Sequence, residues 1–554
     1  MSLFGGLYVG TSGLQTSQNA LNTVAHNMVN VDTVGYTRQQ ISQTDRFYNT
    51  LSKTGSAVSY QQIGLGVEYA EVKQVRDYFL DKSYRRESGR SGFYDVSCDA
   101  IEEAEEIFQE LDGEAFANTL DNLWVSVQEL AKDPSNTVNQ GVFVQRCAEF
   151  ITRANAVYEN FSEYQDDLNV IVKQKVDAMN DLGQKIRELN ESILKIESGQ
   201  VEHANDLRDE RNKYIDELSK YGNISVNTDI DGNYIIQMEG VDFITVGDVK
   251  EIGLYTDPLT GFYTPYWKNL AVIDPVTNQV DPSSLPSARV TDLTLEISTD
   301  INTDIGALKS ALLARGDRRT TFEDVQTGAA YDEVKDSICM NIMAEFDQLV
   351  HDVTTGINEL LYNASVDYYN STTPPTTVPP FPAGGYLVDD STGLPYQIFV
   401  VSSNEKSAIS GDWKDDYTTK NIMINDTIKQ APSLLGLIRP DGIVDQDFAD
   451  NLKTLFSEET HTLNPEVKTT TNLATYYNNL ISQIANTGYV MRGIADNQQV
   501  TVDNIESARQ QIVGVSSDEE LSNMIMFQNA YNASSRYINV VSEMLEHIIN
   551  TLAI

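Results

Sequence analysis

The chain is poor in cysteine, and the little that it has forms no framework. Cys98, Cys147 and Cys339 are an odd set without CxxC spacing in a sequence of 554 residues. Disulfide scaffolds and zinc sites use paired, closely spaced cysteines, so the sequence indicates neither of them. We expect three reduced thiols buried in protein cores.

Long apolar runs and phosphate-binding loops are also missing. No run approaches the roughly 18 apolar residues of a membrane span, and the N-terminus lacks the basic start and compact apolar block of a secretory signal. There is no glycine-rich phosphate loop, and the five histidines lack the i, i+4 pair of a zinc protease helix. The sequence leaves open whether folding brings two residues together as a catalytic dyad, but no pattern favours one. We therefore predict no membrane insertion, no cofactor, no metal site and no catalytic residue.

Positive charge is scarce. The chain has 39 Lys and Arg against 81 Asp and Glu, a formal net charge of −42. The acidic residues are spread along the chain, and such a charge repels phosphate backbones and anionic lipid. We predict that no nucleic acid binds.

Two stretches resemble functional sites, one a calcium-binding loop and the other a cluster of catalytic carboxylates, but both have simpler explanations. Residues 227–239 begin like a calcium-binding EF-hand loop, but the twelfth position is Met238. An Asp-Gly hairpin turn at Asp231 explains this stretch better. The carboxylates of Glu102, Glu103, Glu105 and Glu106 are typical of a solvated helix face.

Both ends of the chain lack charge, although 22% of all residues are charged. No formally charged side chain occurs from Met1 to Val31, and residues 522–554 contain only Arg536, Glu543 and Glu546. Neutral amides and hydroxyls can pair in a crowded, partly wet interface without the desolvation cost of a charge. The alternative is an ordinary buried helix. Nearby glycines and a single strongly apolar stripe favour helices that pack against other chains.

The apolar spacing at each end is helical. At the N-terminus it predicts a helix of about 20 residues, roughly 30 Å long, over 11–30, with Gly5, Gly6 and Gly10 just before it and Gly13 near its start. Near the C-terminus, apolar residues recur every seven positions with a second seam between them, which predicts four heptads of a coiled coil. Ser534 alone breaks that pattern. The heptad positions are Met524, Tyr531, Ile538, Leu545 and Leu552, and the seam between them is Phe527, Val541 and Ile548.

The middle of the chain alternates between helical and β-rich patterns. Helical spacing predicts continuous helix over 155–221, and it resumes over about 304–362 and from 469 to the end. Short strand-like runs separated by turns fill 223–297, including the runs NYIIQM, DFITVG, EIGLYT and LTLEIS. A proline-rich stretch at 371–382 marks a boundary or loop, and a mixed segment follows over 385–464.

These patterns predict a multidomain, mainly α protein with long helices, a terminal coiled coil built from both chain ends, and β-rich outer insertions. The length predicts three or four domains. We place the first in residues 1–60, paired with 520–554. A helical intermediate domain takes 61–222 with 300–365 and 466–519. A β-rich outer domain takes 223–299, and a proline-bounded mixed α/β insertion takes 366–465.

A motif after the first helix resembles a known family. The sequence ALNTVAHNMVNVDTVGYTRQQ, residues 20–40, is similar to the N-terminal signature of the axial proteins of the bacterial flagellum, with matches at Asn27, Asn30, Thr33, Gly35 and Tyr36. His26 and Val29 depart from that pattern. Segments beginning at residues 64, 205, 306 and 514 together resemble the hook-associated family of the hook–filament junction, the FlgK type.

The resemblance implies a structural role and a set of partners. It implies a subunit that joins the hook to the filament, with the hook protein, a filament-side junction protein, an export chaperone and copies of itself in a ring or helical layer as partners. It also implies export by the flagellar apparatus to an extracellular position, and no catalytic residue. We expect the assembly interface to contain Leu14, Leu21, Val24, Asn27, Met28, Asn30, Gly35, Tyr36, Met524, Phe527, Tyr531, Ile538, Val541 and Leu545.

Two other functions stay open at this point. A hook or distal-rod subunit would share the terminal motifs and would form long homopolymers. A secreted adhesin or enzyme displayed on the flagellum would place its activity in a β-rich insertion.

Overall fold

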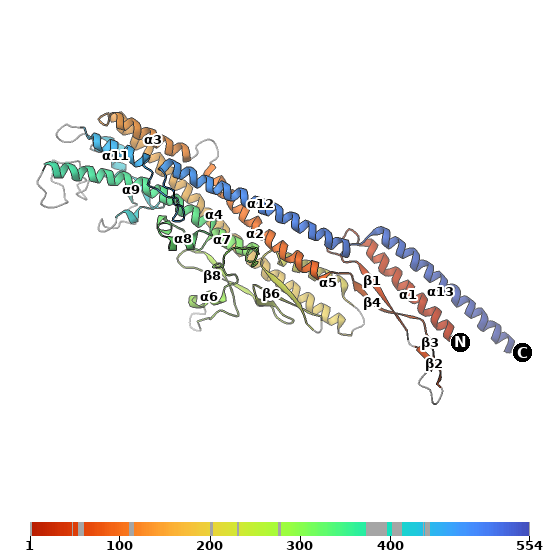
Figure 1. The fold of residues 1–554 in the computed structure, drawn as a ribbon. Helices are drawn as coiled ribbons and strands as arrows, with labels where there is room; N and C mark the ends of the chain where they lie inside the picture. Colours follow the sequence, from red (N-terminus) through yellow and green to blue (C-terminus); the bar gives the residue numbers. More distant parts are fainter. Residues whose placement is uncertain are drawn as a thin grey trace.

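The computed structural model describes residues 3–46, 48–53, 60–109, 116–199, 203–229, 232–274, 279–372, 396–401, 413–435, 437 and 444–552. The molecule is long and narrow, with a helical body at one end and a two-helix hairpin at the other, where both termini lie (Figure 1). The helices are α1 Leu3–Val29, α2 Tyr78–Gln109, α3 Phe116–Lys132, α4 Thr137–Glu197, α5 Asn205–Leu218, α6 Leu285–Ala288, α7 Ala307–Arg315, α8 Gly328–Val334, α9 Ile338–Thr372, α10 Asp426–Gln430, α11 Gln446–Ser457, α12 Leu473–Val513 and α13 Ser517–Leu552.

The strands pair only in small antiparallel sheets. Neighbouring strands pair as β1–β4, β2–β3, β5–β6–β7, β8–β9 and β10–β11. Their bounds are β1 Gln39–Asp45, β2 Tyr48–Lys53, β3 Tyr60–Gly64, β4 Val67–Gln74, β5 Ile224–Thr228, β6 Tyr234–Met238, β7 Val241–Ile244, β8 Ile252–Thr256, β9 Tyr263–Trp267, β10 Phe399–Val401 and β11 Ile422–Ile424. Long helices with small β-rich units are the predicted fold class, and this prediction is confirmed.

The two terminal helices differ from the prediction mainly in their starts. Helix α1 begins at Leu3, several residues before the predicted start, and includes Gly5, Gly6 and Gly10, which were expected to precede it. Glycine is a poor helix former, so packing against α13 has to override the local preference. Helix α13 covers the predicted heptads.

The prediction of continuous helix over 155–221 is wrong after Glu197. Helix α4 ends there, and α5 returns along it in the opposite direction. Arg208 pairs with Glu197 at 2.5 Å, and Arg211 donates to the amide oxygen of Asn190 at 2.8 Å. These contacts hold the reversal, which the apolar spacing of a long helix does not reveal.

Two other predicted segments also differ. The run LTLEIS, residues 293–298, is not a strand. Its backbone makes local hydrogen bonds, such as the one that Thr294 N–H donates to Asp292 Oδ1. The helical stretch predicted for 304–362 is three helices, with Gly316 at φ +78° after α7, and α9 continues to Thr372. Most of the proline-rich stretch, 373–382, lies outside the described residues.

Asparagines on the long helices hold the strand edges. Asn180 of α4 accepts from Ile252 N–H and donates to Ile252 C=O, both at 2.9 Å, as a neighbouring strand would. Asn169 of α4 accepts from Tyr263 N–H at 2.7 Å. Asn358 of α9 donates to Phe399 C=O at 2.9 Å. These amides satisfy strand groups that would otherwise be buried without partners.

Two large cores include both helical and β-rich parts. One joins α2, α3, α4, α9, α11 and α12 to residues 398–437, and the other joins α4, α5 and α7 to β5 through β9. The cores therefore run across the expected limits at 223–299 and 366–465, and those limits stay a prediction. Neither core contains a described residue of α1, α13 or β1 through β4.

Candidate assembly site at the terminal helices

Helices α1 and α13 pack antiparallel, and the C-terminal end of α13 extends beyond the start of α1 (Figure 1). The contact is close because small residues of α1 face α13. A Cβ added to Gly10 would lie 2.6 Å from Ile538 Cγ1, and one added to Gly13 would lie 2.8 Å from Ser534 Oγ. Ser534, the residue that breaks the heptad pattern, is therefore the small partner of a glycine.

The expected interface residues of these two helices lie on the partly covered side of the hairpin. Val24 and Val541 are buried. The other predicted apolar residues are half-buried, namely Leu14, Leu21, Met28, Met524, Phe527, Tyr531, Ile538 and Leu545. Whether they form the assembly interface stays a prediction.

Helix α13 also carries a second apolar stripe, which the heptad analysis missed. We call it the second stripe. Its larger side chains are between 39% and 54% exposed. Ile548 was assigned to the covered seam but is exposed on this stripe. The signal was present in the sequence, because Met526, Ala533 and Val540 recur every seven residues beside the first heptad set. The second stripe consists of Met526, Ala530, Ala533, Tyr537, Val540, Met544 and Ile548. Tyr537 lies at its edge, because its ring also packs against Gly6 and Gly10 of α1.

The outer side of α1 is exposed and uncharged as well. Phe4 and Tyr8 are exposed near its start and Val29 at its end. The positions between them are mainly amides and hydroxyls, namely Thr11, Gln15, Gln18 and Asn22. The hairpin therefore presents neutral side chains on both of its helices.

Asn27 closes the chain reversal that follows α1. It is 1% exposed. Its Oδ1 accepts from Gln39 N–H at 3.0 Å and from the Tyr36 hydroxyl at 2.8 Å, and its Nδ2 donates to Gln39 C=O at 2.9 Å. Asn30 donates to His26 C=O at 3.0 Å, and Gly35 adopts φ +85°. The predicted residues of this motif are thus brought together, and their contacts here are within the chain.

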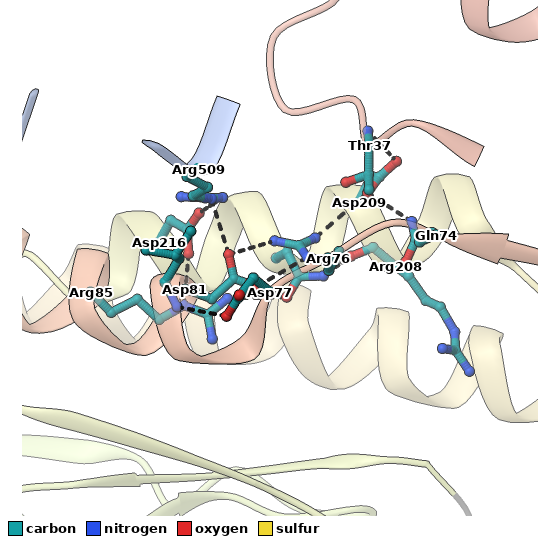
Figure 2. A network of polar contacts seen from close by, with 12 residues as sticks. Thr37, Gln74, Arg76, Asp77, Asp81, Arg85, Arg208, Asp209, Asp216 and Arg509 are labelled. Carbon is teal, nitrogen blue, oxygen red and sulfur yellow. Dashed lines mark hydrogen bonds and ion pairs between the residues drawn. The ribbon is translucent and has the colours of Figure 1, made fainter. Parts of the chain in front are cut away.

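A buried carboxylate links this motif to the body. Asp209 of α5 accepts from Thr37 N–H at 3.0 Å and from Gln74 Nε2 at 2.8 Å (Figure 2). Burial raises the pKa of Asp209 to about 6. Burial, together with the nearby Asp206 and Asp209 carboxylates, also raises the pKa of the Tyr36 hydroxyl.

Arginine–aspartate pairs then hold three helices together behind the motif. Arg509 of α12 lies 3.0 Å from Asp81 of α2 and 2.5 Å from Asp216 of α5, and Arg85 donates to Asp216 at 2.7 Å (Figure 2). Arg76 pairs with Asp81 at 3.0 Å. Sequence reasoning assigned no role to these residues. They lie in or beside the segments that carried the family resemblance, and that was their only signal.

The histidines and the loop that resembles a calcium site do not come together in one place. His26, His203 and His461 each lie beside a different carboxylate, and His351 stacks on Phe322 at 3.7 Å. Asp229 accepts from Asn233 N–H at 2.8 Å in a hairpin turn. In the described part of the chain, no group of three His, Cys, Asp or Glu side chains could hold a metal ion.

None of the helices in the described residues combines the length and apolar character required to cross a membrane.

The three cysteines are free and buried, as predicted. Burial raises the pKa of the Cys98 thiol to about 11 and that of Cys339 to about 12. Burial also raises the pKa of Cys147. All three thiols therefore stay protonated and unreactive at neutral pH.

Three family models match the chain. Residues 101–365 match the flagellar hook-associated protein FlgK helical domain. Residues 7–37 match the flagella basal body rod protein family, and residues 507–551 match the flagellar basal body rod FlgEFG protein C-terminal family. The last two cover most of α1 and α13, so the hairpin has its own family signature at both chain ends.

Relatives match over the full length. The chain is 26% identical to flagellar hook-associated protein 1 of Bacillus subtilis, over 100% of this chain and 99% of the relative. It is 19% identical to the protein of the same name in Escherichia coli, over 97% of this chain and 98% of the relative. The fold is similar to that of the flagellar hook junction protein FlgK from Burkholderia pseudomallei, with a TM-score of 0.51 and 12% identity over 79% of this chain and 100% of the other.

Proposed function

Because this chain is a flagellar hook-associated protein of the FlgK type, a structural subunit of the bacterial flagellum at the junction of hook and filament, we propose that it assembles through the α1/α13 hairpin. The observation that carries this proposal is the second stripe of α13. Helix α1 covers one apolar side of α13 and leaves the other exposed. A helix with two apolar sides needs a second helical neighbour.

The energetics favour a neighbour from another subunit. Covering a large apolar side chain completely contributes about 1.5 to 3 kcal/mol, and the side chains of the second stripe are about half exposed. Each therefore contributes roughly 1 kcal/mol on assembly. The sum over the five large side chains is roughly 5 kcal/mol, which is close to the lower end of the cost of association, about 4 to 15 kcal/mol. The second stripe therefore acts together with the other contacts of the assembled layer.

The neighbour is a further copy of this chain in a ring or helical layer. Two copies that each carry a formal charge of −42 repel one another. They can approach closely only where charge is absent, and the two chain ends are such regions. The expected interface residues other than Gly35 and Tyr36 lie within them.

The remaining partners follow from the position in the flagellum. We place the hook protein on one side of the layer and a filament-side junction protein on the other. An export chaperone would cover the neutral ends before assembly, and the flagellar export apparatus would carry the chain to its extracellular position. Family matches at both ends to rod proteins support an axial location. This role needs no enzymatic activity, cofactor, nucleic acid or membrane.

The two rival functions have less support. A hook or rod subunit would account for the matches at the chain ends but not for full-length similarity to hook-associated proteins. No residue cluster of the described insertions favours an enzyme or an adhesin.

Electron microscopy of flagella tests the proposal. Cells that lack the gene are complemented with the full chain or with Val540→Asp/Met544→Asp, which places two charges on the second stripe. We expect hooks without filaments in the variant, because each unpaired charge would be buried on assembly. Asn539→Asp, an exposed position outside the second stripe, is the matched control and should give normal filaments. Normal filaments in the double variant would refute the proposed interface.

A further inference from the structure

Helix α12 has an exposed side that is almost free of charge. Of its residues, 21 are exposed, and only Asp496 and Asp503 among these are charged. The others are mainly amides, hydroxyls and small residues. Several apolar side chains stand among them, with Tyr489 76% exposed and Val500 58% exposed. We call this surface the neutral face of α12.

An ordinary solvated helix of the same protein looks different. Between Glu159 and Glu188 of α4, 12 residues are exposed and nine of them are charged. That segment of α4 covers its water-facing side with charge. Depletion of charge is a compositional mark of the centre of a protein interface. The neutral face of α12 shares this depletion of charge.

We infer that the neutral face of α12 is a second contact between copies of this chain, continuing the contact proposed for the hairpin. The inference rests on the proposed function. Helix α12 leads into α13 across only Gly514–Ser516, and α12 and α13 follow one another along the molecule (Figure 1). A subunit that meets a neighbour along α13 therefore brings a neighbour close to α12.

The occupant is a copy of the same chain because of charge. A chain with a formal charge of −42 repels a second one wherever their charged helices would meet. The neutral face removes that repulsion along the body of the molecule, just as the neutral ends remove it along the hairpin. A cationic partner would instead be recognised by carboxylates, which this face largely lacks.

The size of the neutral face agrees with a contact that forms only on assembly. Helix α12 has 41 residues. A rise of 1.5 Å per residue and a width of about 10 Å give a strip of roughly 600 Å². This is less than the roughly 800 Å² per partner of a stable interface. The strip alone does not hold two copies together, but it adds to the contact made by the second stripe.

Photo-crosslinking within assembled flagella tests the inference. A benzophenone side chain replaces Tyr489 in the full chain, the cells are irradiated, and the products are identified by mass spectrometry. The matched control carries the same group at Val170, which is 50% exposed on the charged side of α4. A third variant carries it at Met544, which is 51% exposed on the second stripe.

The outcomes separate this inference from the proposed function. We expect a covalent dimer of the chain from positions 489 and 544 and none from 170. A dimer from 544 without one from 489, or a product of 489 with another flagellar component only, overturns this inference and leaves the hairpin proposal standing. No dimer from either position overturns both.

Charge substitutions provide a second measurement. Tyr489→Glu/Val500→Glu alters two exposed residues, so the free chain should fold normally, as circular dichroism will verify. We expect at least about tenfold less of this variant than of the original chain in purified flagella, and no change for Val170→Glu. Equal incorporation of the double variant overturns the inference.

Discussion

Gly13 of α1 lies directly against Ser534 of α13, and a Cβ added to the glycine would be 3.7 Å from the serine Cβ. The pair joins residues from opposite ends of the sequence. It shows that the hairpin is a contact within one chain in this structure, before any second copy is considered.

This spacing predicts a disulfide in Gly13→Cys/Ser534→Cys. The Cβ atoms of a disulfide are usually about 3.5 to 4.5 Å apart. We expect the purified monomer to form the bond within the chain on mild oxidation, and mass spectrometry of a non-reduced digest will detect it. The native cysteines are buried and should not interfere. A product made only of disulfide-linked dimers would mean that α1 pairs with α13 of another copy.

Gly10 and Gly5 should respond in opposite ways to alanine. A Cβ at Gly10 would lie 2.6 Å from Ile538 Cγ1, whereas one at Gly5 would meet nothing within 4 Å. We expect Gly10→Ala to destabilise the hairpin by roughly 1 to 3 kcal/mol through overpacking. Gly5→Ala should stabilise it by up to about 1 kcal/mol through helix propensity. Hydrogen exchange of the α1 amides measures both, and equal protection in the two variants would contradict the close packing at Gly10.

Replacing Asn27 should loosen the joint between hairpin and body. Asn27→Ala removes three hydrogen bonds at once and takes the Asn27 side chain away from the backbone N–H and C=O of Gln39. A buried polar group left unpaired costs about 1 to 3 kcal/mol. We expect faster hydrogen exchange at Gln39 than in the original chain. Asn22→Ala, on the exposed side of α1, is the control, and an unchanged rate at Gln39 in Asn27→Ala would show that the contacts are dispensable.

Glu345 should make stability depend on pH. Its carboxylate is fully buried and accepts from Asn464 Nδ2 at 2.8 Å and from Gln483 Nε2 at 3.0 Å. Burial raises its pKa to about 7 from a usual value of 4.5. The folded state therefore binds a proton more readily than the unfolded state, so this contribution is complete below about pH 4.5 and is lost as the pH rises through 7.

Glu345→Gln isolates that contribution. The amide stays neutral at every pH, and Gln483 can reverse its own amide to supply an acceptor. We expect the variant to be more stable than the original chain at pH 8 by at most a few kcal/mol, and the difference to shrink at pH 5. Urea unfolding at both pH values measures this. An identical difference at pH 5 and pH 8 would show that Glu345 does not titrate in this range.

The apolar periodicities predicted which helices form better than they predicted the residues at which those helices end. Heptads at 524–552 identified α13, because an apolar repeat every seven residues has few structural meanings. Spacing also identified α4 but not its end at Glu197, since α5 continues the same helical pattern after the turn. The run at 293–298 had the composition of a strand, but a strand also needs a neighbour to pair with, and composition does not supply one.

The sequence by itself determined that this protein has neutral, helical ends on an acidic body, because charge and apolar spacing are properties of the chain before it folds. Its motif at 27–36 also indicated the family. Only the tertiary structure decided which side of α13 is covered, because Gly6, Gly10 and Gly13 let α1 approach one stripe and leave the other exposed. It also decided that Asp209, Asp216 and Arg509, far apart in sequence or on separate helices, form one buried network, since the partners of a buried charge are set by packing and not by spacing.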